Sequence, residues 1–313
     1  MISLSHIINP VSSSENEELF QVQQITFESM LKAKKYSDGE NEIELCVINR
    51  SGEKDFVPQG FNVLAPLHRD IRDLVKTTKT YPFLNDIILQ HAQSTAADYL
   101  VYSNLDIAVM PFFYETVSAY INKGHDALVI NRRRVHNRFV DEKNLNILFA
   151  ENGGVHTGYD CFVFKKSLVG KFIFKDICLG VPAVGNDLFY NIFAFAENPI
   201  LLTEKHLTFH IGLELFKNWG DEVTRNHNAK EFQQLMRELL PVMKADNFPG
   251  ADLNIFKRHF KWLMNPTFDY RTMFQLDLKR GFKKTRVKSR SEFVYSRKQR
   301  YLEWLVRVIN FKD

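Results

Sequence analysis

The stretch that decides the fold is "YLVYSNLDIAVMPFFYETV", residues 99–117. Its first four residues are apolar or aromatic and predict a buried strand. The run ends in Ser103, Asn104 and Asp106, and Pro111 then suits the first turn of a following helix. A polar end of this kind is either an ordinary Asn/Asp turn or a place where a ligand is held. The surrounding elements bear on that choice.

Short apolar runs and helical periodicity alternate on both sides of this stretch. We expect strands at residues 2–9, 42–49, 61–66 and 126–131, and helices at residues 12–36, 82–97 and 112–124. Alternating strands and helices are typical of an α/β protein with a mostly parallel central sheet flanked by helices. In such sheets ligands bind beyond the carboxyl ends of the strands, and Asn104 and Asp106 follow one of those ends.

The pattern changes from about residue 150. Residues 156–169 predict a strand and a turn, residues 180–197 an apolar helix after a Gly- and Pro-containing turn, and residues 200–212 a further strand. Beyond Gly212 the periodicity is mostly helical. We therefore expect an α/β domain over 1–215 and a helical extension over 216–313.

Composition excludes several classes of protein. The 313 residues are 45% hydrophobic and 25% charged, which is ordinary for a soluble globular protein. No apolar run approaches the length of a membrane span, and residues 1–18 do not resemble a signal peptide. Three cysteines at unrelated spacing predict neither a disulfide framework nor a zinc site, so we expect a cytoplasmic protein. The common dinucleotide, P-loop and hydrolase motifs are missing from the sequence.

The basic residues are concentrated near one end. Residues 279–300 hold ten Lys or Arg and the single acid Glu292, a local net charge of +9 in a chain of net +4. This segment is either a solvated helical tail or a peripheral contact with anionic lipid, with Phe282, Phe293 and Tyr295 beside the basic residues. Nucleic acid also fits the charge, but no recognised binding motif accompanies it.

Several polar side chains follow predicted strands or begin predicted helices. Asp106, with Asn104, has the oxygen ligands that Mg²⁺ or Mn²⁺ prefers. Asp187 follows a Gly-containing turn near a helix N-terminus, where a capping role is the ordinary explanation. Arg132, in "NRRRVHNR", matches phosphate geometry or belongs to a solvated basic loop.

Two further segments contain polar residues in suggestive positions. In "ENGGVHTGYD", residues 151–160, the glycines permit close approach to a ligand or simply make a flexible loop, and His156 and Asp160 offer polar contacts. In "HLTFHIG", residues 206–212, His206 and His210 share one face of an extended segment. A histidine there is more often an ordinary core or surface residue.

Taken with these residues, the chain from residue 2 to residue 212 resembles the GT-A glycosyltransferases, which are nucleotide-sugar-dependent, and is similar to their family 2 members. In that family an apolar strand leads into a short acidic motif, usually Asp-X-Asp, and a helix follows. Asn104-Leu105-Asp106 stands in the motif position. The first acid is replaced by Asn104, which weakens the charge offered to a cation.

The resemblance implies transfer of a sugar from a nucleotide-diphosphate donor to a hydroxyl of a glycan or lipid-linked acceptor, with inversion. It implies Asp187 as the catalytic base and a divalent cation, Mn²⁺ or Mg²⁺, held by Asp106 and His210. Donor-binding residues would be Asn9, Ser12, Asn104, Asp106, Arg132, His156 and Asp160. The alternative is a non-catalytic module that keeps the fold and docks a membrane or partner through its basic tail. Nucleotidyl transfer would need a basic Gly-rich loop near the N-terminus, which the sequence does not contain.

Overall fold

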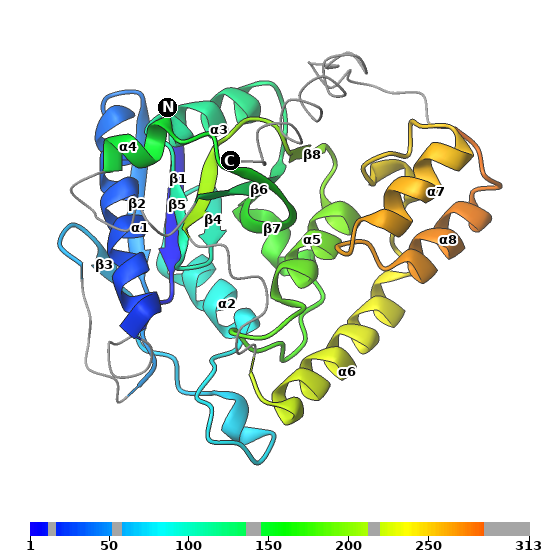
Figure 1. The fold of residues 1–313 in the computed structure, drawn as a ribbon, viewed down its shortest axis with the longest axis horizontal. Coiled ribbons are helices and arrows are strands. Elements are labelled where there is room, and N and C mark those ends of the chain that lie inside the picture. Colours follow the sequence, from blue (N-terminus) through cyan, green and yellow to red (C-terminus); the bar gives the residue numbers. More distant parts are fainter. Residues whose placement is uncertain (12–16, 52–57, 136–144, 212–219, 285–313) are drawn as a thin grey trace, which may run out of the picture.

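The computed structural model describes residues 1–11, 17–51, 58–135, 145–211 and 220–284 (Figure 1). Ser12, the expected domain boundary near residue 215 and residues 285–300 of the basic segment lie outside these ranges. Within the described part of the chain, no helix is long and apolar enough to cross a membrane.

A single sheet forms the centre of the molecule (Figure 1). Its strands lie in the order β3 (Asn62–Val63), β2 (Asn41–Val47), β1 (Ile2–Ile8), β4 (Tyr99–Ser103), β7 (Gly154–Lys165), β6 (Ala127–Val135), β9 (Thr208–Ile211) and β5 (Ile107–Val109), and β8 (Pro199–Leu202) also pairs with β6. Among the described residues, five of the eight strand pairings are parallel. The expected α/β fold with a mostly parallel sheet is confirmed.

Helices cover both faces of the sheet because strand side chains alternate between the faces. Ile8 lies in the core beneath α1 (Glu17–Tyr36) and α3 (Phe113–Asn122), while Ile7 lies in the other core, with α2 (Leu84–Ser94) and α5 (Val184–Phe195). The short helix α4 (Leu145–Ala150) contributes Leu145 and Leu148 to a smaller cluster.

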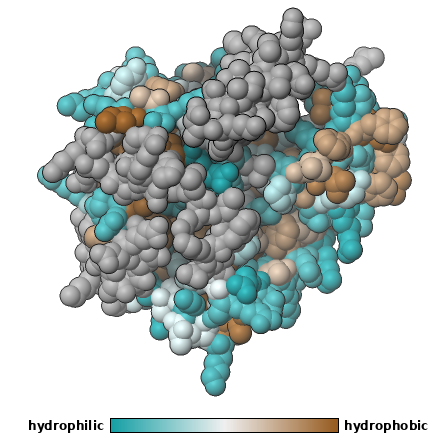
Figure 2. All heavy atoms as spheres, viewed as in Figure 1, coloured by the Kyte–Doolittle hydropathy of each residue, from teal (hydrophilic) through white to brown (hydrophobic). Residues whose placement is uncertain are grey.

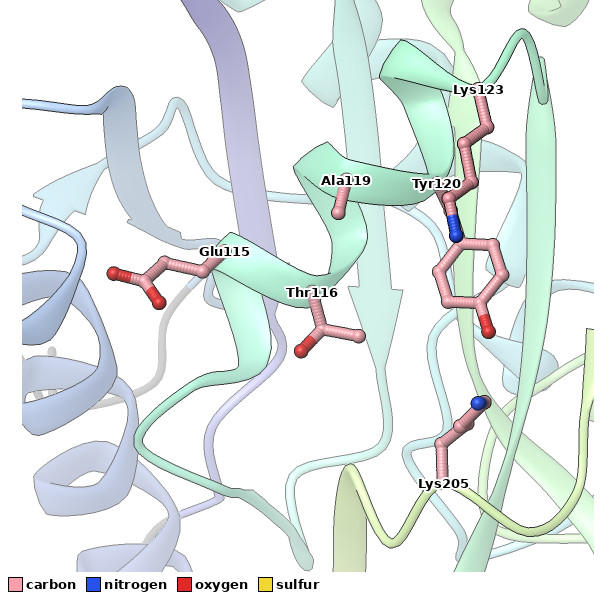
Figure 3. A pocket seen from close by; sticks show the side chains of 6 residues that line it. All are labelled: Glu115, Thr116, Ala119, Tyr120, Lys123 and Lys205. Atoms are coloured by element: carbon pink, nitrogen blue, oxygen red, sulfur yellow. The ribbon is translucent and has the colours of Figure 1, made fainter.

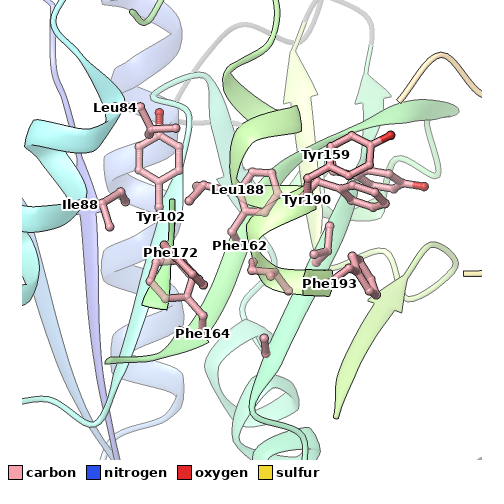
Figure 4. Close-up of a cluster of buried hydrophobic side chains, with 14 of the residues drawn as sticks. Leu84, Ile88, Tyr102, Tyr159, Phe162, Phe164, Phe172, Leu188, Tyr190 and Phe193 are labelled. Carbon is pink, nitrogen blue, oxygen red and sulfur yellow. The ribbon is translucent and has the colours of Figure 1, made fainter. Parts of the chain in front are cut away.

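Aromatic side chains dominate the core between β7 and α5 (Figure 4). The rings of Tyr159 and Phe189 stack with centroids 5.4 Å apart and planes 7° from parallel. Gly185 lies where a Cβ atom would come 2.5 Å from the carbonyl oxygen of Tyr159. The start of α5 is therefore packed directly against β7.

The C-terminal part of the described chain is helical, as expected. It contains α6 (Glu222–Leu239), α7 (Ile255–Met264) and α8 (Tyr270–Lys279). Each begins at a side-chain N-cap, Asp221, Asn254 or Asp269, which accepts a hydrogen bond from a backbone N–H in the first turn. An aromatic contact between Tyr190 and Phe232 joins α6 to α5.

One expectation is wrong: the strand predicted over residues 126–131 is longer in the structure. Arg132, Arg133 and Arg134 do not lie in a loop after a short strand, because β6 continues to Val135 with Arg133 paired to Val155 on one side and to Phe209 on the other. In the glycine-rich segment the strand expected from residue 156 is confirmed, and it begins at Gly154 as part of β7. Pairing with neighbouring strands on both sides holds these polar residues in the sheet, which local composition could not reveal.

Candidate functional site

Six of the predicted side chains meet at one edge of the sheet. The parallel strands β4, β6 and β9 end there, and the antiparallel register places Cys161 of β7 opposite Ser103 and His210 of β9 opposite Ile107 of β5. The six are Asn104, Asp106, Arg132, His156, Asp160 and His210. The edge is the one at which ligands bind in open α/β sheets.

Asn104 holds the turn between β4 and β5. Its backbone N–H donates to the carbonyl oxygen of Asp160 (3.2 Å) and its Nδ2 to Oδ1 of the same residue (3.0 Å). Its Oδ1 accepts a hydrogen bond from the Tyr102 hydroxyl (3.2 Å), and its carbonyl oxygen accepts one from the N–H of Ile107 (3.1 Å). Asn104 thus shapes the turn, and Asp106 is the carboxylate that the turn presents.

Asp106 contacts His210 across the β5–β9 pair. Oδ2 of Asp106 lies 3.0 Å from Nε2 of His210, and the two side chains are 24% and 15% exposed. Burial raises the pKa of Asp106, but His210 and Arg132 lower it, and the net pKa is below the ordinary aspartate value. Asp106 is therefore a carboxylate at neutral pH.

A second pair, Arg132 and Asp160, lies beside the first. Nη1 of Arg132 is 2.8 Å from Oδ2 of Asp160. Burial raises the pKa of Asp160 and Arg132 opposes this, leaving the pKa above its ordinary value. The Nε atoms of Arg132 and Arg134 are buried with no hydrogen-bond partner among the described residues. Because buried donors are normally paired, these two guanidinium N–H groups need an acceptor that the described protein does not supply.

His156 is held in place by the backbone of β7 and β6. Its Nδ1 accepts a hydrogen bond from the N–H of Gly158 (2.8 Å), and its carbonyl oxygen accepts one from Nδ2 of Asn131 (3.1 Å). Burial, followed by the positive charges of Arg132 and Arg134, lowers its pKa to about 4. The imidazole is therefore neutral at neutral pH, and since Nδ1 accepts from Gly158, its Nε2 carries the proton and can donate a hydrogen bond.

The donor atoms fit a divalent cation only in part. Two neighbouring ligands of an octahedral ion at about 2.1 Å stand about 3 Å apart, which is the separation of Oδ2 of Asp106 and Nε2 of His210. No group of three or more His, Cys, Asp or Glu side chains suited to a metal occurs among the described residues. The chain would contribute these two ligands, and substrate phosphates and water would complete the coordination, as is usual for Mg²⁺.

Asp187 lies in the first turn of α5 but is not its cap, which is Ala183 with φ 87°. Its side chain is fully buried. Oδ1 accepts a hydrogen bond from Nδ2 of Asn191 (2.7 Å), and Oδ2 has no partner among the described residues. Burial raises the pKa of Asp187 to about 8 despite the hydrogen bond from Asn191. The role of this carboxyl group as a base stays a prediction.

The ends of β1 and β2 contribute asparagines to the same edge. Asn9 donates from Nδ2 to the carbonyl oxygen of Ile48 (2.7 Å) and so ties the two strand ends together. Asn49, which sequence reasoning missed, is buried, and its Nδ2 has no partner in the described protein. Its position in the sequence could have identified it, because Asn49 ends an expected parallel strand just as Asn9 does.

A separate hollow of about 370 Å³ opens on another part of the surface (Figure 3). It is lined by Glu115, Thr116, Ala119, Tyr120, Lys123 and Lys205. None of the predicted site residues lines it, and Lys123 already stacks over the Tyr120 ring at 5.4 Å. We assign it no part in the site.

Comparison with known proteins identifies the architecture. No protein-family model and no curated protein matches the chain. Among solved structures, S. aureus TarS residues 1–349 in complex with UDP-GlcNAc superposes with a TM-score of 0.50 at 13% identity, over 83% of this chain and 73% of that one. The fold is GT-A-like. The resemblance seen in the sequence is thereby confirmed at the level of fold.

A second solved structure is less similar. It is glucosyl-3-phosphoglycerate synthase from Mycobacterium tuberculosis in complex with Mn²⁺, UDP and phosphoglyceric acid. It matches with a TM-score of 0.44 at 14% identity, over 75% of this chain and 78% of that one.

Proposed function

We propose that this protein is a glycosyltransferase that moves a sugar from a nucleotide-diphosphate donor to a hydroxyl of a glycan or lipid-linked acceptor. One observation carries the proposal. At the carboxyl edge of a GT-A-like sheet, the carboxylate of Asp106 is close enough to Arg132 for that charge to lower its pKa. The buried Nε donors of Arg132 and Arg134 have no partner among the described residues. The TarS structure contains UDP-GlcNAc, so a uridine-diphosphate sugar is the first donor to test.

The diphosphate oxygens would accept hydrogen bonds from the unpaired Nε–H groups of Arg132 and Arg134. Guanidinium N–H groups match phosphate oxygens in geometry and remain charged at any physiological pH. As the glycosidic bond breaks, negative charge develops on the leaving diphosphate, and fixed positive groups at that place stabilise it. When a divalent cation is bound by Asp106 and His210, it supplies further positive charge to the same oxygens.

Asp187 would accept the proton of the acceptor hydroxyl in a direct displacement that inverts the anomeric carbon. In the buried state its pKa is about 8, so at neutral pH the group holds a proton that it must release before it can act as a base. A base must also reach the hydroxyl, and this side chain is fully buried. The role therefore requires the turn before α5 to rearrange when the acceptor binds. Ala183 in this turn has φ 87°, a strained conformation for a residue other than glycine.

Titration calorimetry with UDP, in the presence and absence of Mn²⁺, tests the donor site directly. In the presence of Mn²⁺ we expect Asp106→Ala to weaken binding at least about tenfold, because it removes a ligand of the cation. Arg134→Ala should weaken binding by a similar factor, because charge-assisted hydrogen bonds contribute roughly 1.5–3 kcal/mol. Asp38→Ala is the matched control, since Asp38 is exposed in the turn after α1.

Transfer assays with UDP-sugars then test the reaction. Full activity in Asp106→Ala would remove Asp106 from its assigned role. If the wild-type protein binds no nucleoside diphosphate under any condition, the enzyme proposal is wrong and a non-catalytic binding module takes its place.

A further inference from the structure

The helical pair α7–α8 lies at one side of the molecule (Figure 1), where large apolar side chains reach the surface (Figure 2). On α7, Phe256 is 85% exposed and Phe260 is 66% exposed. Spacings of three and four residues place them on one face of the helix with Leu263 and Met264. On α8, Phe274 and Leu278 are also exposed. These six residues are called the apolar face below.

The same two helices bury charge against each other. Arg258 of α7 and Asp277 of α8 are both fully buried, with Nη2 and Nε of the arginine 2.6 and 3.0 Å from Oδ2 of the aspartate. His259 contacts the same oxygen at 2.9 Å, and Arg280 contacts Oδ1 at 3.0 Å. This ion cluster sets the rotation of each helix about its axis. The buried ion cluster therefore orients α7 so that its phenylalanines face outward.

Exposed basic side chains occur on the same two helices and just after α8. The exposed ones are Lys257, Lys261, Arg271, Lys279, Lys283 and Lys284. Residues 253–284 contain two acids, and neither is exposed: Asp277 lies in the ion cluster and Asp269 caps α8. The surface thus combines apolar side chains with positive charge and has no exposed acid in this stretch.

We propose that the apolar face and its basic residues bind the surface of an anionic lipid bilayer. Large apolar side chains enter the boundary between headgroups and acyl chains, and Lys and Arg beside them are attracted to anionic headgroups. A second copy of the same face would bring the same positive charges together, which opposes self-association. The proposal does not depend on the proposed transferase activity, because lipid binding is measured without any donor sugar.

Co-sedimentation of the full chain with vesicles tests the proposal. We expect binding to vesicles of phosphatidylglycerol and phosphatidylcholine in equal parts, little binding to phosphatidylcholine alone, and weaker binding at high salt. The double variant Phe256→Ser, Phe260→Ser should lower the affinity at least about tenfold, because each buried CH₂ contributes about 0.8 kcal/mol to membrane binding. Lys257→Glu with Lys279→Glu should also lower it.

Phe112→Ser is the matched control, since Phe112 is an exposed phenylalanine at the start of α3, and it should bind vesicles as the wild type does. Thermal unfolding of each variant verifies that the fold is kept. Equal vesicle binding by the wild type and the Phe256/Phe260 double variant would overturn the proposal. Sedimentation velocity tests whether a second copy of the protein binds the apolar face. If the wild type is a dimer, the double variant is a monomer and neither protein binds vesicles, the face serves self-association instead.

Discussion

Replacing Asp187 by asparagine removes a carboxyl group that burial keeps protonated in the folded protein. The folded-state pKa is about 8, compared with 3.8 for an unperturbed aspartate. Between these values the folded protein holds a proton that the unfolded chain releases. The free energy of unfolding therefore falls as the pH rises through this window.

The size of the effect follows from the two pKa values. A difference of one bound proton changes the free energy of unfolding by about 1.4 kcal/mol per pH unit. Asp187 therefore lowers the free energy of unfolding of the wild type by roughly 3 kcal/mol between pH 5 and pH 7. Over the whole window, from 3.8 to about 8, the limit is about 6 kcal/mol. The asparagine side chain of Asp187→Asn has nearly the same shape as aspartate and keeps an oxygen that accepts from Asn191. It does not titrate, so the variant lacks this contribution to the pH dependence of stability.

Urea unfolding at a series of pH values measures the difference between the two proteins. Burial lowers the pKa of His6 to about 3 and that of His91 to about 4, so these histidines make the wild type more stable as the pH rises toward 6.5. They are present in both proteins, and subtraction cancels them. We expect the stability of Asp187→Asn relative to the wild type to increase steadily from pH 5 to pH 8.

Asp38→Asn, an exposed substitution, is the control and should follow the wild-type curve. Parallel curves for Asp187→Asn and the wild type would refute the reasoning, because they would show that Asp187 is ionised in the folded protein throughout. The same variant separates structure from chemistry: if Asp187 is the base, Asp187→Asn loses transfer while it keeps UDP binding.

Three further substitutions test other contacts. Arg258→Ala should lower the free energy of unfolding by about 3–5 kcal/mol in urea, because it leaves Asp277 buried without its main partner; a loss under 1 kcal/mol would contradict this. Phe189→Ala should cost about 3–5 kcal/mol by opening a cavity beside Tyr159, measured by thermal unfolding with Phe112→Ala as the exposed control. Arg132→Lys should weaken UDP binding in calorimetry, because lysine cannot replace the paired donors, and unchanged affinity would argue against a phosphate contact.

Much of the fold was readable in the sequence because parallel α/β sheets have strong local patterns. The apolar run of residues 99–102 and the alternation around it predicted buried strands joined by helices, and the structure has them. The predicted site residues Asn104 and Asp106 were identified by a simple rule: polar side chains that follow a buried strand lie at the edge where ligands bind. Asn49 satisfied the same rule and was overlooked.

Other features depended on partners far away in the chain. Arg132 was expected in a loop, but pairing with β7 and β9 holds it in a strand. Local sequence does not specify which distant strands pair, so it could not predict that Arg132 would meet Asp160. The meeting of His210 with Asp106 was expected only through the resemblance to the GT-A glycosyltransferases.

The sequence by itself determined the α/β class, the strand-end position of Asp106 and the helical character of the C-terminal part, because hydrophobic periodicity and capping residues are local signals. Only the tertiary structure decided that the carboxyl group of Asp187 is sealed inside the protein and that α7 and α8 bury Arg258 with Asp277 while they expose Phe256. Burial is a property of the whole packed chain. It sets both the pKa of a carboxyl group and the face that a helix presents to its surroundings.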